Sequence, residues 1–271
     1  MRVLVTGAAG QIGSVLCSGL FDRGHTVAAM DLVPEREGFT GDWFTADCSD
    51  PDALDAVLTA IGAGRLDAVV HLAGTPDEAS LPDELQSHVI ATGALLDAMV
   101  RHGVPRIVYA SSNHAVGRTP AGQPLRIDVR PRPDTFYGVA KVAAEALLSL
   151  YVDRHGLDAV AVRIGSFMAQ PESRRALSTW LSHDDAVRMF EACLTTPDPG
   201  FAVLYGVSAN TRGWWDLEPG RALGYHPEDD AERFADLVVP GADDEAEAAY
   251  VGGPMATDAF LRPAVDRTAP A

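Results

Sequence analysis

The sequence predicts an α/β protein with a Rossmann-type doubly wound parallel sheet, followed by a small C-terminal region. Short apolar runs alternate with helical patterns over the first two thirds of the 271 residues. A glycine-rich turn directly follows the first apolar run, as in nucleotide-binding sheets. Polar residues recur where the apolar runs end, which is the edge at which parallel sheets bind ligands. These three observations together indicate the fold class.

The predicted elements follow one another in a regular order. Residues 2–6 form a short apolar run that leads through glycines into a helical pattern with apolar positions at Val15, Leu16 and Leu20. Pro51, preceded by Ser49 or Asp50 as the cap, marks the start of the next helix. The predicted strands are residues 2–6, 26–30, 42–46, 67–72, 106–111, 158–164 and 201–207. The later helices are predicted at residues 51–61, 81–102, 135–155 and 182–193.

The turn containing Gly7, Gly10 and Gly13 indicates a dinucleotide site. Glycines let the backbone approach a pyrophosphate, whose charge is stabilised by the N-terminus of the following helix. The second strand ends at Asp31, about 18 residues after the last glycine, close to the spacing of a ribose-binding carboxylate. An acid there accepts hydrogen bonds from both ribose hydroxyls and repels a 2′-phosphate. NAD is therefore predicted, although the nearby Arg36 could serve NADP.

Tyr137 and Lys141 are spaced so that their side chains share one face of a helix, one turn apart. We expect the ammonium to lower the pKa of the phenol, because a nearby positive charge favours the ionised form. Ser112, at the end of the preceding strand, can hold a substrate oxygen against that phenol. The arrangement suits proton removal from an alcohol while hydride leaves the same carbon. A tyrosine and a lysine at this spacing are common on ordinary helices, so the prediction depends on the rest of the chain.

The composition of the chain restricts the kinds of partner that it is expected to bind and the cellular compartment in which it is expected to work. A net charge of −17 argues against nucleic acid and anionic membranes as partners. An anionic substrate would need a specific arginine to reverse the local field. There is no apolar run of about 18 residues, so no membrane span is expected. The first predicted strand begins at residue 2, so we expect no signal peptide. The three cysteines are widely spaced, so we expect reduced thiols and a cytoplasmic protein. The histidines, cysteines and acidic residues do not have the spacing of a metal site. We also expect the protein to form a homo-oligomer.

The motifs together resemble the extended short-chain dehydrogenase/reductase superfamily. The similarity rests on residues 7–13, Asp31, residues 71–74, Tyr137 and Lys141. Within that superfamily the chain is similar to the uronate dehydrogenases. The more specific matches are residues 110–114, 163–166, 177–185, 208–210 and 213–216.

The resemblance implies oxidation of D-glucuronate or D-galacturonate at C1 with NAD, giving an aldarolactone. It implies that Ser112, Tyr137 and Lys141 form the catalytic group. Arg175 would bind the C6 carboxylate through a planar bidentate contact, and its spacing to residues 177–180 favours it over Arg174. The residues expected at the substrate are Thr75, Ser112, Asn113, His114, Ser166 and Arg175. Those expected at the cofactor are Gly7, Gly10, Gln11, Ile12, Gly13, Asp31, Asp47, Cys48, Leu72, Ala73, Gly74, Tyr137 and Lys141.

Two positions depart from the family pattern. Pro76 stands where a serine is usual, so only Thr75 offers a hydroxyl in that loop. His88 stands where the superfamily has the helix asparagine that organises the active-site loop. Substrate preference or rate can therefore differ from the family norm, and the choice between glucuronate and galacturonate stays open.

The predicted organisation has three parts. Residues 1–166 are expected to bind NAD and carry the serine, tyrosine and lysine, and residues 167–240 to form a small substrate-binding region. Residues 241–271 are expected to be an acidic, Ala- and Pro-rich tail that is loosely ordered or forms an oligomer contact. The alternatives are a nucleotide-sugar epimerase or dehydratase that keeps its NAD bound, and an NAD-sensing regulator without chemistry. Release of free NADH would separate the dehydrogenase from the epimerase.

Overall fold

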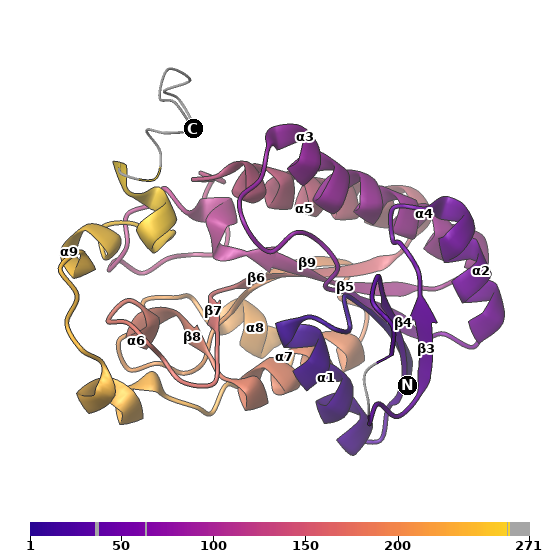
Figure 1. The fold of residues 1–271 in the computed structure, drawn as a ribbon, viewed down its shortest axis with the longest axis horizontal. Helices are drawn as coiled ribbons and strands as arrows, with labels where there is room; N and C mark the ends of the chain where they lie inside the picture. Colours follow the sequence, from indigo (N-terminus) through magenta and orange to yellow (C-terminus); the bar gives the residue numbers. More distant parts are fainter. Residues whose placement is uncertain (36–37, 63, 259, 261–271) are drawn as a thin grey trace.

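The computed structural model describes residues 1–35, 38–62, 64–258 and 260. Its centre is a parallel seven-stranded sheet, in the order β3-β2-β1-β4-β5-β6-β9 (Figure 1). The strands are β1 Arg2–Thr6, β2 Thr26–Asp31, β3 Asp42–Thr45, β4 Ala68–His71, β5 Arg106–Ser112, β6 Asp158–Ile164 and β9 Phe201–Gly206. The strand order reverses direction between β1 and β4, which is the doubly wound arrangement and confirms the predicted fold class.

Helices cover both faces of this sheet. On one face lie α1 (Gln11–Asp22) and α7 (His183–Thr195), which pack against each other. On the other face lie α2 (Pro51–Ile61), α4 (Ala91–His102) and α5 (Phe136–His155). The helix predicted at residues 81–102 is one helical run made of α3 (Leu81–Glu84), a π-helical turn (Leu85–Ile90) and α4. Asp50 caps α2, accepting hydrogen bonds from the backbone N–H groups of Asp52 and Ala53, as one of the two predicted caps.

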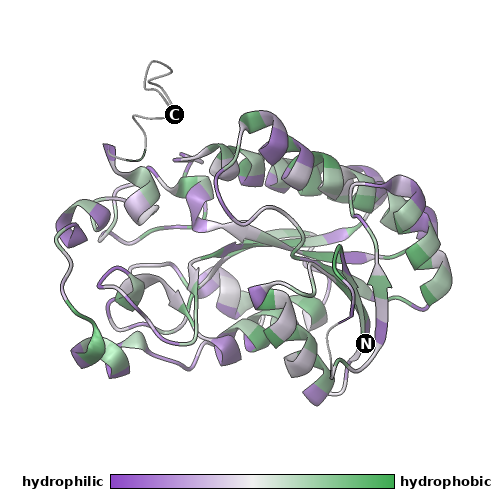
Figure 2. Cartoon of the chain, in the orientation of Figure 1, coloured by the Kyte–Doolittle hydropathy of each residue, from purple (hydrophilic) through white to green (hydrophobic). Residues whose placement is uncertain are grey.

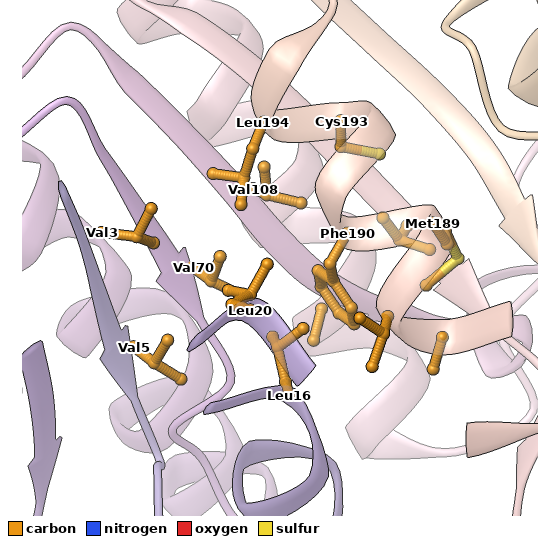
Figure 3. Close-up of a cluster of buried hydrophobic side chains, with 14 of the residues drawn as sticks. Val3, Val5, Leu16, Leu20, Val70, Val108, Met189, Phe190, Cys193 and Leu194 are labelled. Atoms are coloured by element: carbon orange, nitrogen blue, oxygen red, sulfur yellow. The ribbon is translucent and has the colours of Figure 1, made fainter. Parts of the chain in front are cut away.

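The core is divided by the sheet into two apolar layers. Val3 and Val5 of β1 point to the α1/α7 side, where they meet Leu16 and Leu20 of α1 (Figure 3). Leu4, between them, belongs to the layer beneath α2, α4 and α5. Both faces of the strands are therefore buried, which explains why the strands read as continuous apolar runs. Figure 2 shows the same pattern, with hydrophobic colour along the central strands and hydrophilic colour on the outer sides of the helices.

The C-terminal third contributes to the main sheet as well as to the edge where its strands end. Both α7 and β9 fall in the predicted substrate-binding region, and β9 pairs in parallel with β6 along its length. A separate two-stranded sheet, β7 (Ser166–Phe167) and β8 (Trp180–Leu181), lies beside α6 (Ala176–Thr179). The remaining short elements are α8 (Glu218–Ala222), α9 (Asp244–Glu247) and 3-10 turns at Asn113–Val116, Ala231–Leu237 and Gly253–Ala256.

The part of the predicted tail that the structure describes is folded. Asp244–Glu247 form α9 and Gly253–Ala256 form a 3-10 turn, and between them Tyr250 makes an isolated antiparallel bridge with Pro120. Val251 is fully buried. Residues 241–258 thus differ from the loose order expected, because they pack against the body of the molecule. Residue 259 and residues 261–271 lie outside the described residues.

Within the described part of the chain, no helix is both long and apolar enough to cross a membrane.

Candidate active site

The glycine turn lies where β1 ends and α1 begins. Gly7 has φ +69°, and a Cβ there would lie 2.7 Å from the backbone nitrogen of Ala73. A Cβ on Gly13 would lie 2.3 Å from the carbonyl oxygen of Gly7. Both positions therefore require glycine, one for its dihedral angle and both for close backbone packing. This packing brings the turn directly against the loop after β4, where Leu72, Ala73 and Gly74 were predicted to bind the cofactor.

The residues of this turn fit a dinucleotide. Gly10, which precedes α1, has no side chain to cap the helix, so the first turn carrying Gln11 and Ile12 is available to an anion. Asp31 ends β2 and accepts a hydrogen bond from the backbone nitrogen of Ala9 at 2.8 Å, which places its carboxylate beside the turn. Arg36 lies outside the described residues.

Asp47 and Cys48 follow β3 at the same edge. The Asp47 carboxylate accepts a hydrogen bond from the Ser49 backbone nitrogen at 2.7 Å. Cys48 is buried, and burial raises the pKa of its thiol to about 12. The thiol is therefore a neutral packing group at this position.

Ser112, Tyr137 and Lys141 converge from two elements. Ser112 ends β5, while Tyr137 and Lys141 lie one turn apart near the start of α5. The Tyr137 phenol hydrogen-bonds Ser112. Lys141 donates from Nζ to the Ala110 carbonyl at 2.7 Å, and Nζ lies 5.1 Å from the centroid of the Tyr137 ring. Lys141 is the only lysine in the sequence.

The electrostatics of this group differ from the expectation. Burial raises the pKa of Tyr137 to about 12, partly opposed by the Ser112 hydrogen bond and reinforced by Glu84 and Asp77. Burial also lowers the pKa of Lys141 to about 7, against the attraction of Glu84 and Glu145. The predicted lowering of the phenol pKa by the lysine is therefore wrong for this structure. The reason is that both groups lose water, which disfavours phenolate and ammonium alike.

A pocket of about 180 Å³ opens beside these residues. Its walls include the predicted residues Ser112, Asn113, His114 and Tyr137. They also include Pro76, Glu78, Gly165 and Met255. Pro76, the departure from the family pattern, thus faces the pocket directly. Glu78, Gly165 and Met255 were missed from the sequence: Glu78 lay two positions from a residue already singled out, whereas no local pattern signals Met255.

His114 is fixed in the pocket wall by a buried acid. Its Nδ1 lies 2.9 and 3.0 Å from the two carboxylate oxygens of Asp134, whose side chain is fully buried. Because a carboxylate accepts hydrogen bonds, Nδ1 carries the proton. The other ring nitrogen, Nε2, is left to exchange hydrogen bonds with a ligand. Asn113 donates from Nδ2 to the Val251 carbonyl at 3.3 Å.

Arg175 lies behind the pocket wall, in contact with residues 250–256, which we call the strap. Its Nη2 donates to the Val251 carbonyl at 2.8 Å, and its Nη1 lies 3.4 Å from Ser166 Oγ. Gly253 has φ +62°, and a Cβ there would lie 2.1 Å from Arg175 Nε. This Nε is buried and has no hydrogen-bond partner among the described residues. Arg174, by contrast, is exposed and pairs with Asp244 at 3.4 Å.

Thr75 and His88 hold the loop after β4. The Thr75 hydroxyl and backbone nitrogen both contact Ser87 Oγ, at 3.1 and 2.8 Å, and Thr75 is not among the residues that line the pocket. His88 Nε2 lies 3.0 Å from the Thr75 carbonyl, and its ring packs edge-on against Tyr137 with centroids 5.2 Å apart. Burial lowers the pKa of His88 to about 3. The histidine is therefore neutral and anchors the loop.

A second, larger hollow of about 440 Å³ lies at the other edge of the sheet, where the strands begin. Arg106 in its wall is already paired with Asp158 at 2.8 Å. None of the predicted site residues lies there.

Comparison with known proteins identifies the relatives of the chain. The NAD dependent epimerase/dehydratase family matches residues 3–185. The uronate dehydrogenase of Pseudomonas syringae pv. tomato is 36% identical over 258 residues, which cover 93% of this chain and 92% of that protein. The crystal structure of uronate dehydrogenase from Agrobacterium tumefaciens superposes with a TM-score of 0.87 at 38% identity, covering 96% of this chain and 98% of that chain.

A tyrosine-to-alanine mutant of the Agrobacterium tumefaciens enzyme, complexed with NAD, superposes with a TM-score of 0.86 at 38% identity, covering 94% of this chain and 96% of that chain. The matched residues 3–185 include the glycine turn, Asp31, Ser112, Tyr137 and Lys141 described above. The chain therefore belongs to the NAD dependent epimerase/dehydratase family.

Proposed function

We propose that this protein is an NAD-dependent dehydrogenase that oxidises a hexuronic acid, D-glucuronate or D-galacturonate, at C1 to the aldarolactone. The observation that carries the proposal is the convergence of Ser112, Tyr137 and Lys141 on a pocket of about 180 Å³. That pocket adjoins a glycine turn suited to a dinucleotide. The relatives that match over nearly the whole chain include uronate dehydrogenases.

The cofactor would be held by the edge of the sheet where β1, β2 and β4 end. The α1 N-terminus and its glycine turn would bind the pyrophosphate, and Asp31 the adenosine ribose. NAD, when bound, accepts the hydride from C1 and brings a positive charge to the site. The loop of Leu72, Ala73 and Gly74 and the residues Asp47 and Cys48 would line the rest of the cofactor site.

Tyr137 is the residue that exchanges the proton of the C1 hydroxyl. Its oxygen already hydrogen-bonds Ser112, so a substrate oxygen placed between them is oriented by both hydroxyls. Lys141 lies beneath the ring and supplies positive charge to the phenolate whenever it is protonated. With a pKa near 7, it is close to half protonated at neutral pH.

The sugar acid would be bound by groups on three segments. Asn113 and His114 would bind ring hydroxyls from the pocket wall, and Ser166, whose hydroxyl lies beside Arg175, would bind another. Arg175 would bind the C6 carboxylate: a guanidinium has five donors, and the strap uses one of them at Val251. Its buried Nε lacks a hydrogen-bond partner among the described residues, a state that costs free energy until an acceptor arrives.

NADH formation, followed by absorbance, tests the proposal. Purified protein is mixed with NAD and either D-glucuronate or D-galacturonate, with glucose and NADP as controls. We expect a clear rate with the uronates and NAD, and a much lower one with glucose or NADP. If no free sugar acid supports NADH formation, the proposed reaction is wrong, and nucleotide-sugar substrates become the next to assay.

We also propose a cytoplasmic homo-oligomer. Ile90, Phe136, Val139 and Leu150 are apolar side chains that stay 38–54% exposed on the neighbouring helices around α4 and α5. Such exposure over adjacent helices supports a contact with a second copy. Light scattering coupled to size-exclusion chromatography would give the mass in solution, and a monomer mass would contradict the proposal.

A further inference from the structure

Tyr137 is the second residue of α5, so its position depends on how that helix begins. The first four backbone N–H groups of a helix have no partner within its regular hydrogen bonding. In α5, Thr135 Oγ1 accepts from Gly138 N at 2.8 Å, and Val139 N donates to the Thr135 carbonyl at 3.0 Å. The N–H groups of Phe136 and Tyr137 are left over.

Glu78 accepts both of them. Its Oε1 lies 2.9 Å from Phe136 N and its Oε2 lies 2.9 Å from Tyr137 N. The glutamate precedes these residues by 58 and 59 positions and comes from the loop after β4. A carboxylate that accepts two N–H groups at a helix N-terminus makes charge-assisted hydrogen bonds and faces the positive end of the helix dipole.

The loop that carries Glu78 is itself anchored on both sides. Before it, Thr75 N donates to Ser87 Oγ at 2.8 Å. After it, Ala79 N donates to Glu84 Oε1 at 2.7 Å. The same loop begins with Leu72–Gly74, which pack against the glycine turn. Glu78 therefore links the cofactor side of the site to the helix that carries the tyrosine.

The start of α5 has little room to move. A Cβ on Gly138 would lie 2.4 Å from the His114 carbonyl, so the helix backbone packs directly on the turn that follows β5. Glu78 and Tyr137 both line the pocket, together with Ser112 and His114. A shift of about 1 Å in a reacting group can cost on the order of 100-fold in rate.

We propose that Glu78 is a positioning residue for Tyr137. From the loop after β4 it caps the N-terminus of α5, and the cap sets the position and direction of the Tyr137 phenol in the pocket. This inference rests on the proposed dehydrogenase function, because that function makes Tyr137 the proton-exchanging group. Glu78 itself exchanges no proton or hydride in this inference, but it affects kcat because it positions Tyr137.

The kinetic test compares Glu78→Ala and Glu78→Gln with wild type. Glu78→Ala removes both acceptors, and we expect kcat to fall about 30- to 100-fold. Glu78→Gln keeps one acceptor oxygen and should lose about tenfold. The KM for NAD should stay within about twofold, and the loss in kcat should be the same for both uronates, since both use Tyr137.

Asp230 supplies the matched control. Its Oδ1 also accepts two backbone N–H groups, from Thr211 at 2.9 Å and Glu232 at 3.0 Å, but away from the pocket. Asp230→Asn should lower Tm about as much as Glu78→Gln and leave kcat within about twofold of wild type. An equal loss of kcat in Asp230→Asn would overturn the inference, because activity would then follow stability alone.

Amide hydrogen exchange gives a readout that needs no turnover. The N–H groups of Phe136 and Tyr137 should exchange faster in Glu78→Ala than in wild type or Asp230→Asn. Unchanged exchange at these two amides would overturn the inference, whether or not uronates prove to be substrates. If the two amides exchange as expected but the wild-type protein does not oxidise uronates, the proposed function is wrong. The capping of α5 by Glu78 would still be established.

Discussion

Tyr137 and Lys141 sit in surroundings that hold each of them toward its uncharged form. The pKa of the phenol is raised to about 12 and that of the ammonium is lowered to about 7, in both cases chiefly by burial. The spacing of four residues correctly placed the two side chains on one helix face. It carries no information on how much water either group loses, and so the direction of the phenol shift could not be predicted from the sequence.

Tyr137→Phe tests the role of the phenol oxygen. The ring still fills its site against His88, so the fold and the cofactor site should be preserved. We expect kcat with uronate and NAD to fall at least about 100-fold, because proton transfer loses its partner. NAD affinity, measured by tryptophan fluorescence, should stay within about twofold. Near-normal turnover in this variant would contradict the assignment.

Among individual residues, the position at the pocket was predicted for residues that lie at the end of a strand. Ser112 ends β5, Asn113 and His114 follow it, and all three line the pocket. Thr75 also follows a strand, yet its hydroxyl donates to Ser87 and Thr75 does not line the pocket. Side-chain partners such as Ser87 are set by helix packing, which a strand pattern does not reveal. The roles of the predicted site residues stay predictions until variants are measured.

The strap is the element that local sequence patterns missed. Its Val251 carbonyl accepts hydrogen bonds from Asn113 at 3.3 Å and from Arg175 at 2.8 Å, and Met255 lines the pocket. Strands and helices were predicted from apolar periodicity within a few residues. The strap has no such periodicity and is held by contacts with residues far away in the chain. Residues 241–271, which contain the strap and are acidic and then rich in Ala and Pro, were therefore predicted to be loosely ordered or an oligomer contact.

Gly253→Ala tests whether the strap sets the position of Arg175. A Cβ at residue 253 would lie 2.1 Å from Arg175 Nε, so either the guanidinium or the strap must shift. We expect the KM for uronate to rise about tenfold, with smaller changes in kcat and in the KM for NAD. Gly103→Ala is the matched control, since Gly103 has φ +68° with no atom near its missing Cβ. Equal effects of the two substitutions on KM would show that backbone strain, and not Arg175, is responsible.

At the scale of the whole molecule, burial of histidines beneath the site ties stability to pH. Burial, with the nearby charge of Lys141, lowers the pKa of both His71 and His88 to about 3 in the folded protein. In the unfolded chain both would titrate near 6.5. The unfolded state thus binds more protons between these values, so the free energy of unfolding falls as pH drops below about 6.5.

His88→Asn isolates one part of this dependence. The variant lacks one of the two buried titrating groups, so its Tm should fall less than that of wild type between pH 7.5 and pH 4.5. The exposed His226, changed to Asn, serves as the matched control substitution. Parallel Tm curves for His88→Asn and wild type would contradict the assignment of the acid sensitivity to His88.

The sole lysine of the chain lies at the floor of the site, and this has a practical consequence for chemical labelling. Amine-directed reagents have a single side-chain target, and its pKa near 7 leaves a large fraction of it as the reactive free amine at neutral pH. The other cationic side chains of the protein are arginines and histidines, which such reagents leave unmodified. Modification at this one amine should therefore report directly on access to the site, and a bound dinucleotide should shield it. Immobilisation or dye labelling through lysine, routine for most enzymes, would here be directed at the candidate active site.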